Sequence, residues 1–305
     1  MDDNATEITF HGFVNVHMYR YFYFVIMVTV YFLIICFNIT IVCIIWVHRS
    51  LHEPMYVFIA ALLLNSVLFS TNIYPKLLLD FLSDTQVISH QACLLQFFLF
   101  YSLGGSEFLL LAAMAYDRYV SICRPLLYPS IMRRSRVSVL LVSTWFVAAS
   151  HVAVPAILSS NSPLCSYSVT GIFCNNVIYG LQCVESRAIA VFGVVALVDI
   201  IILPVLFIVF SYTRILLVVF GSSRDIKRKA ADTCLPHLLV LSSFFCLSIY
   251  DIIAARVESH LPAPARFIMT LQIVLYHPLF NPVVYGVKMK EISTRLRKLI
   301  CAAKH

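Results

Sequence analysis

Seven long stretches of mostly apolar residues alternate with shorter polar connections along the chain. An α-helix needs about 20 such residues to cross the hydrocarbon core of a bilayer. The stretches do not show strand-type alternation, and a helix satisfies its backbone hydrogen bonds within the segment, as lipid requires. The pattern therefore predicts an all-α membrane protein, a seven-transmembrane helix bundle. The predicted spans are residues 21–47, 54–79, 93–119, 138–158, 189–217, 234–255 and 267–287.

The composition supports this class and argues against an ordinary soluble domain. Hydrophobic residues make up 61% of the 305 residues, and charged residues only 12%, whereas soluble domains are about 25% charged. So little charge cannot cover a water-facing globule of this size. A largely polar stretch precedes the first span without the short basic region of a cleaved signal peptide, so we interpret that span as an uncleaved signal anchor.

The placement of Lys and Arg predicts the orientation of the bundle. Of the 22 Lys and Arg residues, 17 lie on or beside the connections that follow the first, third, fifth and seventh spans, which leaves 5 on the opposite side. The positive-inside rule then makes residues 1–20 an extracellular N-terminus, 21–287 the transmembrane domain and 288–305 a cytoplasmic tail. The net charge of +7 is thus an orientation signal facing lipid headgroups and protein, and we expect no nucleic-acid partner.

Cysteines and an acceptor triplet add chemistry to the outer side. Asn4-Ala5-Thr6 is a glycosylation triplet on the side where that modification occurs. Four cysteines lie at the outer ends of spans, where disulfides persist, and their spacing alone leaves all three connectivities open. They are Cys93, Cys165, Cys174 and Cys183. Cys301, beside basic residues after the last span, is either a palmitoylation site or a free thiol.

Several motifs occur in order on the predicted spans. They are LHEPMY at 51–56, MAYDRYVSICRPLLYP at 114–129, Trp145, SYTRI at 211–215, KAADTCLPHL at 229–238 and PLFNPVVY at 278–285. Together they resemble the signature of the olfactory receptors, within the rhodopsin-like class A G-protein-coupled receptors, over almost the whole chain. The stretch AALLLNS at 60–66 is similar to the fish-type branch of that family.

The resemblance implies a function and a cellular place. An odorant would bind in the outer half of the bundle, open the cytosolic face and activate a stimulatory olfactory-type heterotrimeric G protein, raising cyclic AMP. The receptor would be a multi-pass protein of the plasma membrane of olfactory sensory neurons, surrounded by lipid and without a cofactor. The resemblance also implies disulfides Cys93 to Cys174 and Cys165 to Cys183, and a short amphipathic helix after the seventh span.

The resemblance further implies which residues face the ligand. They are Phe100, Tyr101, Gly104, Gly105, Ala196, Leu197, Ile200, Phe245, Ile252, Leu271 and Val274, with Asp251 as a further candidate. The pair Gly104-Gly105 either opens space for the ligand or lets helices pack closely. Asp199 either anchors a cationic ligand or faces a neighbouring helix as a structural acid.

A second set of residues would couple the bundle to the G protein. It comprises Asp117, Arg118, Tyr119, Tyr212, His237, Asn281, Pro282 and Tyr285. Arg118 is either a plain interface pair with Asp117 or turns inward on activation to contact Tyr212 and the G protein. Many related receptors hold this arginine with an acid on the sixth helix. Here that region reads Lys227-Arg228-Lys229, so we expect Asp117 and His237 to restrain the resting form. Pro282 should bend the seventh helix.

Polar side chains at mid-membrane depth are functional candidates because each is costly there. Asn38, Glu107 and Asn281 are such groups, and the second span has Asn65-Ser66 where the family has an acid. Glu107 either supplies the missing charge, binds an ion, or is protonated and hydrogen-bonded. We expect no other metal site.

Other functional classes have less support. The chain lacks HExxH, GxSxG, phosphate-loop and CxxC motifs, so we do not expect an enzyme. A proton-coupled transporter would suit Glu107 and Asp199, but the internal repeats or broken paired helices typical of transporters are absent from the sequence. Within receptors, the alternative is a non-olfactory class A receptor for an amine or a peptide.

Overall fold

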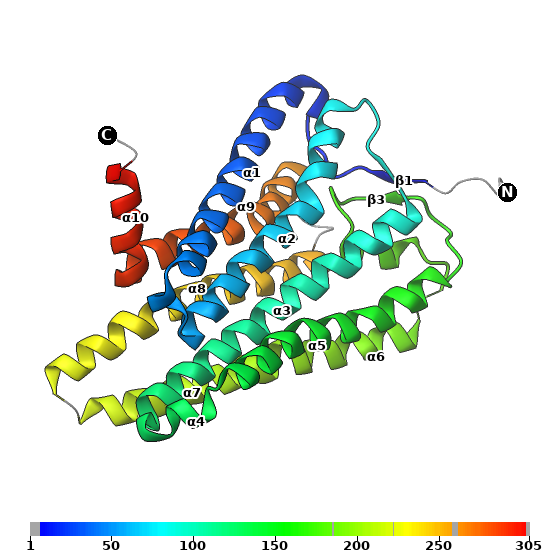
Figure 1. The fold of residues 1–305 in the computed structure, drawn as a ribbon. Helices are drawn as coiled ribbons and strands as arrows, with labels where there is room; N and C mark the ends of the chain where they lie inside the picture. The colour runs from blue at the N-terminus through cyan, green and yellow to red at the C-terminus, as the bar shows by residue number, and fades with distance from the viewer. Residues whose placement is uncertain (1–6, 185, 222, 258–261, 303–305) are drawn as a thin grey trace.

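A computed structural model describes residues 7–184, 186–221, 223–257 and 262–302, and it is mainly a bundle of long helices (Figure 1). The helices are α1 (Val16–Val47), α2 (Pro54–Leu82), α3 (His90–Cys123), α4 (Tyr128–Ile131), α5 (Arg134–Ser160), α6 (Arg187–Ala196), α7 (Leu203–Phe220), α8 (Arg224–Val257), α9 (Ala263–Lys288) and α10 (Lys290–Ala302). Short 3₁₀ turns are η1 (Arg49–Leu51), η2 (Pro125–Leu127) and η3 (Asn176–Leu181), and η4 (Leu197–Ile202) is a π-helical turn.

The predicted seven-helix bundle is confirmed. Spans one to four are α1, α2, α3 and α5, the fifth runs through α6, η4 and α7, and the last two are α8 and α9. Six helices among the described residues are long and apolar enough to cross a membrane, and α8 contributes a shorter described apolar stretch, Cys234–Cys246. Helices α1 and α8 begin before their predicted spans because both continue into polar sequence beyond the apolar run.

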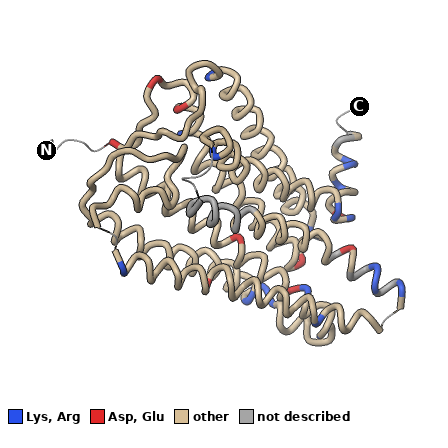
Figure 2. Tube along the Cα trace, turned by 180° about the vertical axis from the view of Figure 1, so that it is seen from behind, with Lys and Arg blue, Asp and Glu red and all other residues tan. Residues whose placement is uncertain are grey.

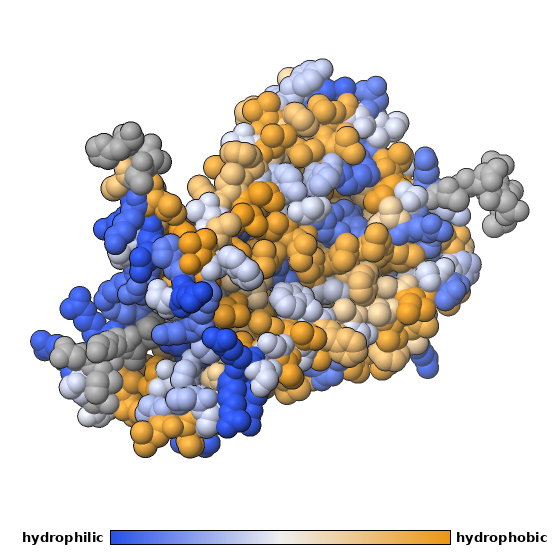
Figure 3. Space-filling view, in the orientation of Figure 1, coloured by the Kyte–Doolittle hydropathy of each residue, from blue (hydrophilic) through white to orange (hydrophobic). Residues whose placement is uncertain are grey.

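The surface has the polarity that a bilayer requires. Large apolar side chains such as Trp46 and Phe146 are 80% and 71% exposed, and apolar residues cover the middle of the bundle in the space-filling view (Figure 3). Most Lys and Arg residues lie toward the end that carries the C-terminus (Figure 2). This separation agrees with the orientation predicted from the charges.

A small three-stranded sheet, which the sequence did not predict, lies at the N-terminal end of the all-α bundle. Strand β1 (Glu7–Phe10) pairs antiparallel with β2 (Val87–Ser89) and parallel with β3 (Ser168–Val169). Ile8 and Phe10 on β1 are buried among residues of the outer loops. The sequence EITF has strand-type alternation, but it is too short to stand out from a polar N-terminus.

Pro282 and Pro204 each remove one backbone hydrogen bond from a membrane helix. Pro282 has no N–H to give to the carbonyl of Pro278, one turn earlier. Asn38 on α1 replaces that donor, since its Nδ2 donates to the Pro278 oxygen at 2.9 Å. Pro204 likewise cannot bond the carbonyl of Ile200, and the preceding turn is the π-helical η4. The polar side chain at mid-membrane depth therefore repairs a backbone that a proline has interrupted.

The two adjacent glycines of α3 have different surroundings. A Cβ added at Gly105 would lie 2.9 Å from Cγ2 of Ile200 and 3.5 Å from Cβ of Ala148, whereas one added at Gly104 would meet nothing within 4 Å. Gly105 therefore serves close packing of α3 against α5 and η4. Gly104 faces open space.

We expect Gly105→Ala to destabilise the protein by about 1–3 kcal/mol, because the β-branched Ile200 is buried and cannot turn aside. Gly104→Ala is the matched control, and we expect it to be neutral or stabilising by up to about 1 kcal/mol through helix propensity. Thermal unfolding of the two purified variants in detergent measures the difference. Equal melting temperatures would contradict this assignment of Gly105.

Candidate functional site

A cavity of about 710 Å³ lies in the outer half of the bundle. Its wall comes from α2, α3, α5, α6, η4, α8 and α9, and η3 of the second outer loop contributes from above. The predicted ligand-facing residues that line it are Phe100, Tyr101, Gly104, Gly105, Ala196, Leu197 and Ile200. Its volume is within the range of small-molecule sites, which are concave and mostly apolar.

The other predicted ligand residues do not line this cavity. Phe245 packs against the inner core, and Leu271 and Val274 belong to the core between α1, α2 and α9. The cavity wall instead contains Phe244, Ser248 and Ile273. A step of one residue turns a helical side chain by about 100°, and the side of α8 and α9 that faces the cavity differs from the expected side by about that angle. The side chains of Asp251 and Ile252 lie outside the described residues.

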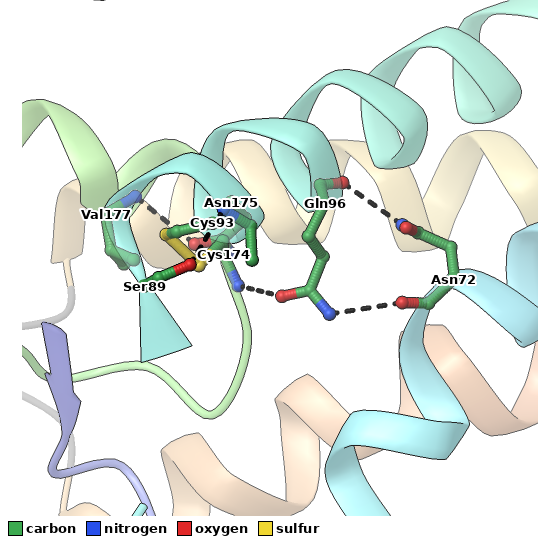
Figure 4. The surroundings of a disulfide bond; sticks show 8 residues. Asn72, Ser89, Cys93, Gln96, Cys174, Asn175 and Val177 are labelled. Carbon is green, nitrogen blue, oxygen red and sulfur yellow. Dashed lines mark hydrogen bonds between the residues drawn. A yellow bond between two sulfur atoms is a disulfide. The ribbon is translucent and has the colours of Figure 1, made fainter. Parts of the chain in front are cut away.

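The second outer loop is fastened over the cavity by covalent and hydrogen bonds (Figure 4). The structure contains the disulfides Cys93–Cys174 and Cys165–Cys183, the pairing that the resemblance implies. The Cys174 N–H donates to Oε1 of Gln96 at 2.8 Å.

Gln96 also connects the loop to α2. Its Nε2 donates to the carbonyl of Asn72, and Nδ2 of Asn72 donates to the carbonyl of Gln96, both at 3.1 Å. Gln96, which makes both of these hydrogen bonds, is buried, with 5% of its surface exposed. One buried amide therefore connects α2, α3 and the loop, a role that the sequence reasoning missed.

The cavity wall is polar at a few points only. The Tyr101 hydroxyl accepts from the backbone N–H of Asn176 at 3.2 Å, which joins α3 to the loop. Within the described residues, the wall includes no Asp, Glu, Lys or Arg, and His151 on α5 is its one histidine. Nε2 of His151 lies 3.1 Å from Oδ2 of Asp199, an acid on η4 that does not line the cavity. Of the two interpretations of Asp199, this contact favours the structural one.

Asn65 joins three helices beneath the cavity. Its Nδ2 donates to the carbonyl of Leu103 at 2.9 Å, and its Oδ1 accepts from Ser106 Oγ at 2.8 Å and from Trp145 Nε1 at 3.0 Å. Asn65 and Ser106 are fully buried. This network fixes α2, α3 and α5 to one another.

A second polar cluster joins α2, α3 and α9. Nδ2 of Asn281 donates to Oε1 of Glu107 at 2.8 Å and to Oγ of Ser66 at 3.1 Å. Nδ1 of His277 lies 3.1 Å from the same Glu107 oxygen, without regular hydrogen-bond geometry. A cavity of about 20 Å³ adjoins Ser66, Glu107, Ser248 and His277, which is room for about one water molecule. Glu107 therefore lies in a cluster whose side chains can rearrange around a small polar molecule such as water.

The inner end of α3 holds the charged pair of the DRY motif. Nε of Arg118 donates to Oδ2 of Asp117 at 3.0 Å, its Nη2 pairs with the same oxygen, and the Tyr128 hydroxyl donates to Oδ1 at 2.8 Å. Asp117 is fully buried, so its charge is balanced within the protein.

The other predicted coupling residues surround this pair. Tyr212 on α7 is hydrogen-bonded to His237 on α8. Tyr119 and Tyr285 pack in the same inner core. The bond between Tyr212 and His237 joins the fifth and sixth spans at their inner ends, so any separation of these ends has to break it.

An ion pair on the cytosolic side was not foreseen. Nζ of Lys290, at the start of α10, lies 2.6 Å from Oδ2 of Asp232 on α8 and lowers the pKa of that carboxyl. From the sequence, Lys227–Lys229 are the expected neighbours of Arg118, whereas Asp232, three residues further along α8, pairs with Lys290 of α10 instead. Asp232 lies in the motif KAADTC, but its partner Lys290 is distant in the sequence, so the sequence alone does not predict the ion pair.

Comparisons with known proteins agree with the geometry. The family model described as olfactory receptor matches residues 27–303. The chain belongs to the olfactory receptor family. Human olfactory receptor 11A1 is 34% identical over 98% of this chain and 95% of its own, and human olfactory receptor 11H2 is 35% identical over 97% and 91%. Human olfactory receptor 51E1 is 34% identical over 91% and 88%.

Membership gives the protein its broad function. It is an odorant-binding G-protein-coupled receptor and a multi-pass membrane protein, a receptor rather than an enzyme. G-protein coupling and a cyclic AMP response follow from the olfactory receptor family in general. The fish-type branch stays a prediction, and Asn4 lies outside the described residues.

We expect Gln96→Ala to destabilise this olfactory receptor by about 1–3 kcal/mol, because the buried N–H of Cys174 loses its acceptor. Gln91→Ala, at an exposed position on the same helix, is the control and should be neutral. Thermal unfolding of both purified variants measures the effect. A melting temperature for Gln96→Ala equal to that of Gln91→Ala would refute the role assigned to Gln96.

Proposed function

We propose that this olfactory receptor binds a small odorant in the 710 Å³ cavity and signals through a stimulatory olfactory-type G protein, raising cyclic AMP. The observation that carries the proposal is the position of the cavity. It lies beneath a fastened loop and directly above the Glu107 cluster. Phe244, Ser248 and Ile273 line both this cavity and the small polar one. A ligand that moves these side chains therefore changes the surroundings of Glu107 and His277.

The activation step is a shift between two arrangements of the inner ends. A ligand shifts the balance only by its preference for the open arrangement. In the arrangement described here, Arg118 is held by Asp117, and Tyr212 is held by His237. Separating α7 from α8 breaks the second bond and frees Tyr212 to meet Arg118. Pro282 gives α9 a point at which to bend.

The inner surface offers a docking face to the G protein. Leu126 on η2, seven residues after Tyr119, is 95% exposed. Basic residues lie on the same side, among them Arg133, Arg134 and Arg136 at the start of α5. An exposed apolar anchor amid positive charge suits an amphipathic partner helix.

The cellular setting follows the family. We place the receptor in the plasma membrane of olfactory sensory neurons, with residues 1–20 outside and 288–305 inside. Asn4 would be glycosylated on the outer side. An amine receptor is a weaker candidate, because the carboxylate of Asp199 is engaged by His151.

The test is a cyclic AMP assay in cells that deliver the receptor to their surface. Pools of amino acids, bile-type steroids, amines and apolar volatiles serve as stimuli. We expect one pool to raise cyclic AMP and Arg118→Ala to abolish the response at equal surface level. Arg297→Ala, at an exposed position on α10 outside this docking face, is the control and should keep the response. Silence toward all pools by a receptor verified at the surface would contradict the odorant assignment.

We also expect Asp232→Asn to raise ligand-independent cyclic AMP by up to about fivefold, because the variant loses an ion pair whose contribution is small at an exposed site. The pair between Asp232 and Lys290 connects α8 to α10 and opposes outward movement of α8. Exchanging both charges, Asp232→Lys with Lys290→Asp, should return basal signalling to the parent level. Basal signalling that is the same in all three receptors would show that the pair does not restrain α8.

A further inference from the structure

His151 and Asp199 form an ionisable pair at the edge of the ligand cavity that the signalling scheme does not use. His151 lines the cavity from α5, and Asp199 on η4 lies behind it without lining the cavity. The side chains are 25% and 43% exposed. The two residues thus stand between the cavity and the outer surface of the bundle, on two different spans.

The hydrogen bonds of this pair fix the number of protons that it holds. Nδ1 of His151 lies 2.9 Å from the carbonyl of Val147, an acceptor, so Nδ1 carries a proton. Nε2 faces Oδ2 of Asp199 at 3.1 Å, and a lone pair on each atom would repel the other. One further proton therefore lies between them. Whether it belongs to the ring or to the carboxyl, the pair has no net charge.

We propose that the His151–Asp199 pair sets the charge selectivity of the cavity, so that it accepts uncharged amphipathic ligands and disfavours both amines and carboxylates. The inference rests on the proposed function in taking this cavity as the ligand site. Its wall, within the described residues, includes no Asp, Glu, Lys or Arg. His151 is the one ionisable imidazole of this described wall, and Asp199 lies 3.1 Å from its Nε2 on the side away from the cavity.

The rest of the wall fits such a ligand. Phe97, Phe100 and Phe108 on α3 line the cavity together with Phe244 on α8. The amide and hydroxyl groups of Asn176, Gln182 and Ser186 lie on the side of the second outer loop. A molecule with an apolar body and an uncharged hydrogen-bonding end has a partner for each part.

Removing one member of the pair should give the cavity a charge. In His151→Ala, Asp199 becomes a carboxylate without a counter-charge, beside a cavity of low polarity. A single unpaired charge on the order of 10 Å away, at an effective dielectric constant of about 20, changes the local concentration of a monovalent ion by about tenfold. In the double variant His151→Ala/Asp199→Asn, the wall should again be neutral.

The experiment measures this charge without needing an agonist or a signal. Gly104→Cys places a thiol in the cavity, where an added Cβ meets nothing within 4 Å. Three methanethiosulfonate reagents, one cationic, one anionic and one uncharged, are applied to membranes, and labelling is followed by mass spectrometry. The rates are compared in the parent, His151→Ala, Asp199→Asn and double backgrounds. The parent without Gly104→Cys corrects for the native cysteines.

The expected result is a cationic-to-anionic rate ratio near that of a small free thiol in the parent and in the double variant. Because the cationic rate should rise and the anionic rate should fall by this factor, the ratio should rise about a hundredfold in His151→Ala. Equal labelling by the uncharged reagent in all backgrounds shows that the cavity is intact. If His151→Ala changes that labelling, His151→Asn replaces it in the comparison. A ratio unchanged in the histidine variants, or already strongly cation-favouring in the parent, would overturn the proposal. Failure of the cyclic AMP test would leave this measurement unaffected.

Discussion

The architecture depends on the need to satisfy every backbone hydrogen bond away from water. Helices meet that need by themselves except where a proline removes a donor, and each such place needs a substitute. The Asn38 amide is the substitute at Pro278. At Pro204 the chain adopts the π-helical turn η4 instead. This turn carries Leu197 and Ile200 into the cavity wall and Asp199 against His151. A local backbone repair thus determines part of the shape and the electrostatics of the cavity.

The buried polar groups divide into a fixed set and an adjustable set. Both polar side-chain atoms of Asn65 are hydrogen-bonded, and they join α2, α3 and α5. The cluster around Glu107 is incompletely satisfied, since neither ring nitrogen of His277 has a regular hydrogen-bond partner. A partly satisfied network has alternative arrangements of similar energy. Its position between the cavity and the inner ends is where a receptor needs such freedom.

Much of this could be predicted from the sequence, because apolar length and Lys/Arg placement act locally and strongly. The seven spans, their orientation and seven of the cavity residues follow from pattern and resemblance. The facing of Phe245 and Val274 does not, since a rotation of about 100° depends on packing against other helices. The partners of Asp199 and Asp232 could not be predicted from the sequence either, because His151 and Lys290 lie 48 and 58 positions away. The strand β1 was hidden because four residues carry almost no periodic signal.

The small outer sheet also has a consequence for the order in which the receptor can be built. Strand β1 is synthesised first, but it lies between β2 and β3 and is completed only by residues near 168. Its partners reach the far side of the membrane after the second and fourth spans have been inserted. Pairing between distant segments is slow to form. The mouth of the receptor is therefore finished late in biogenesis, because β1 pairs with strands that are synthesised after it.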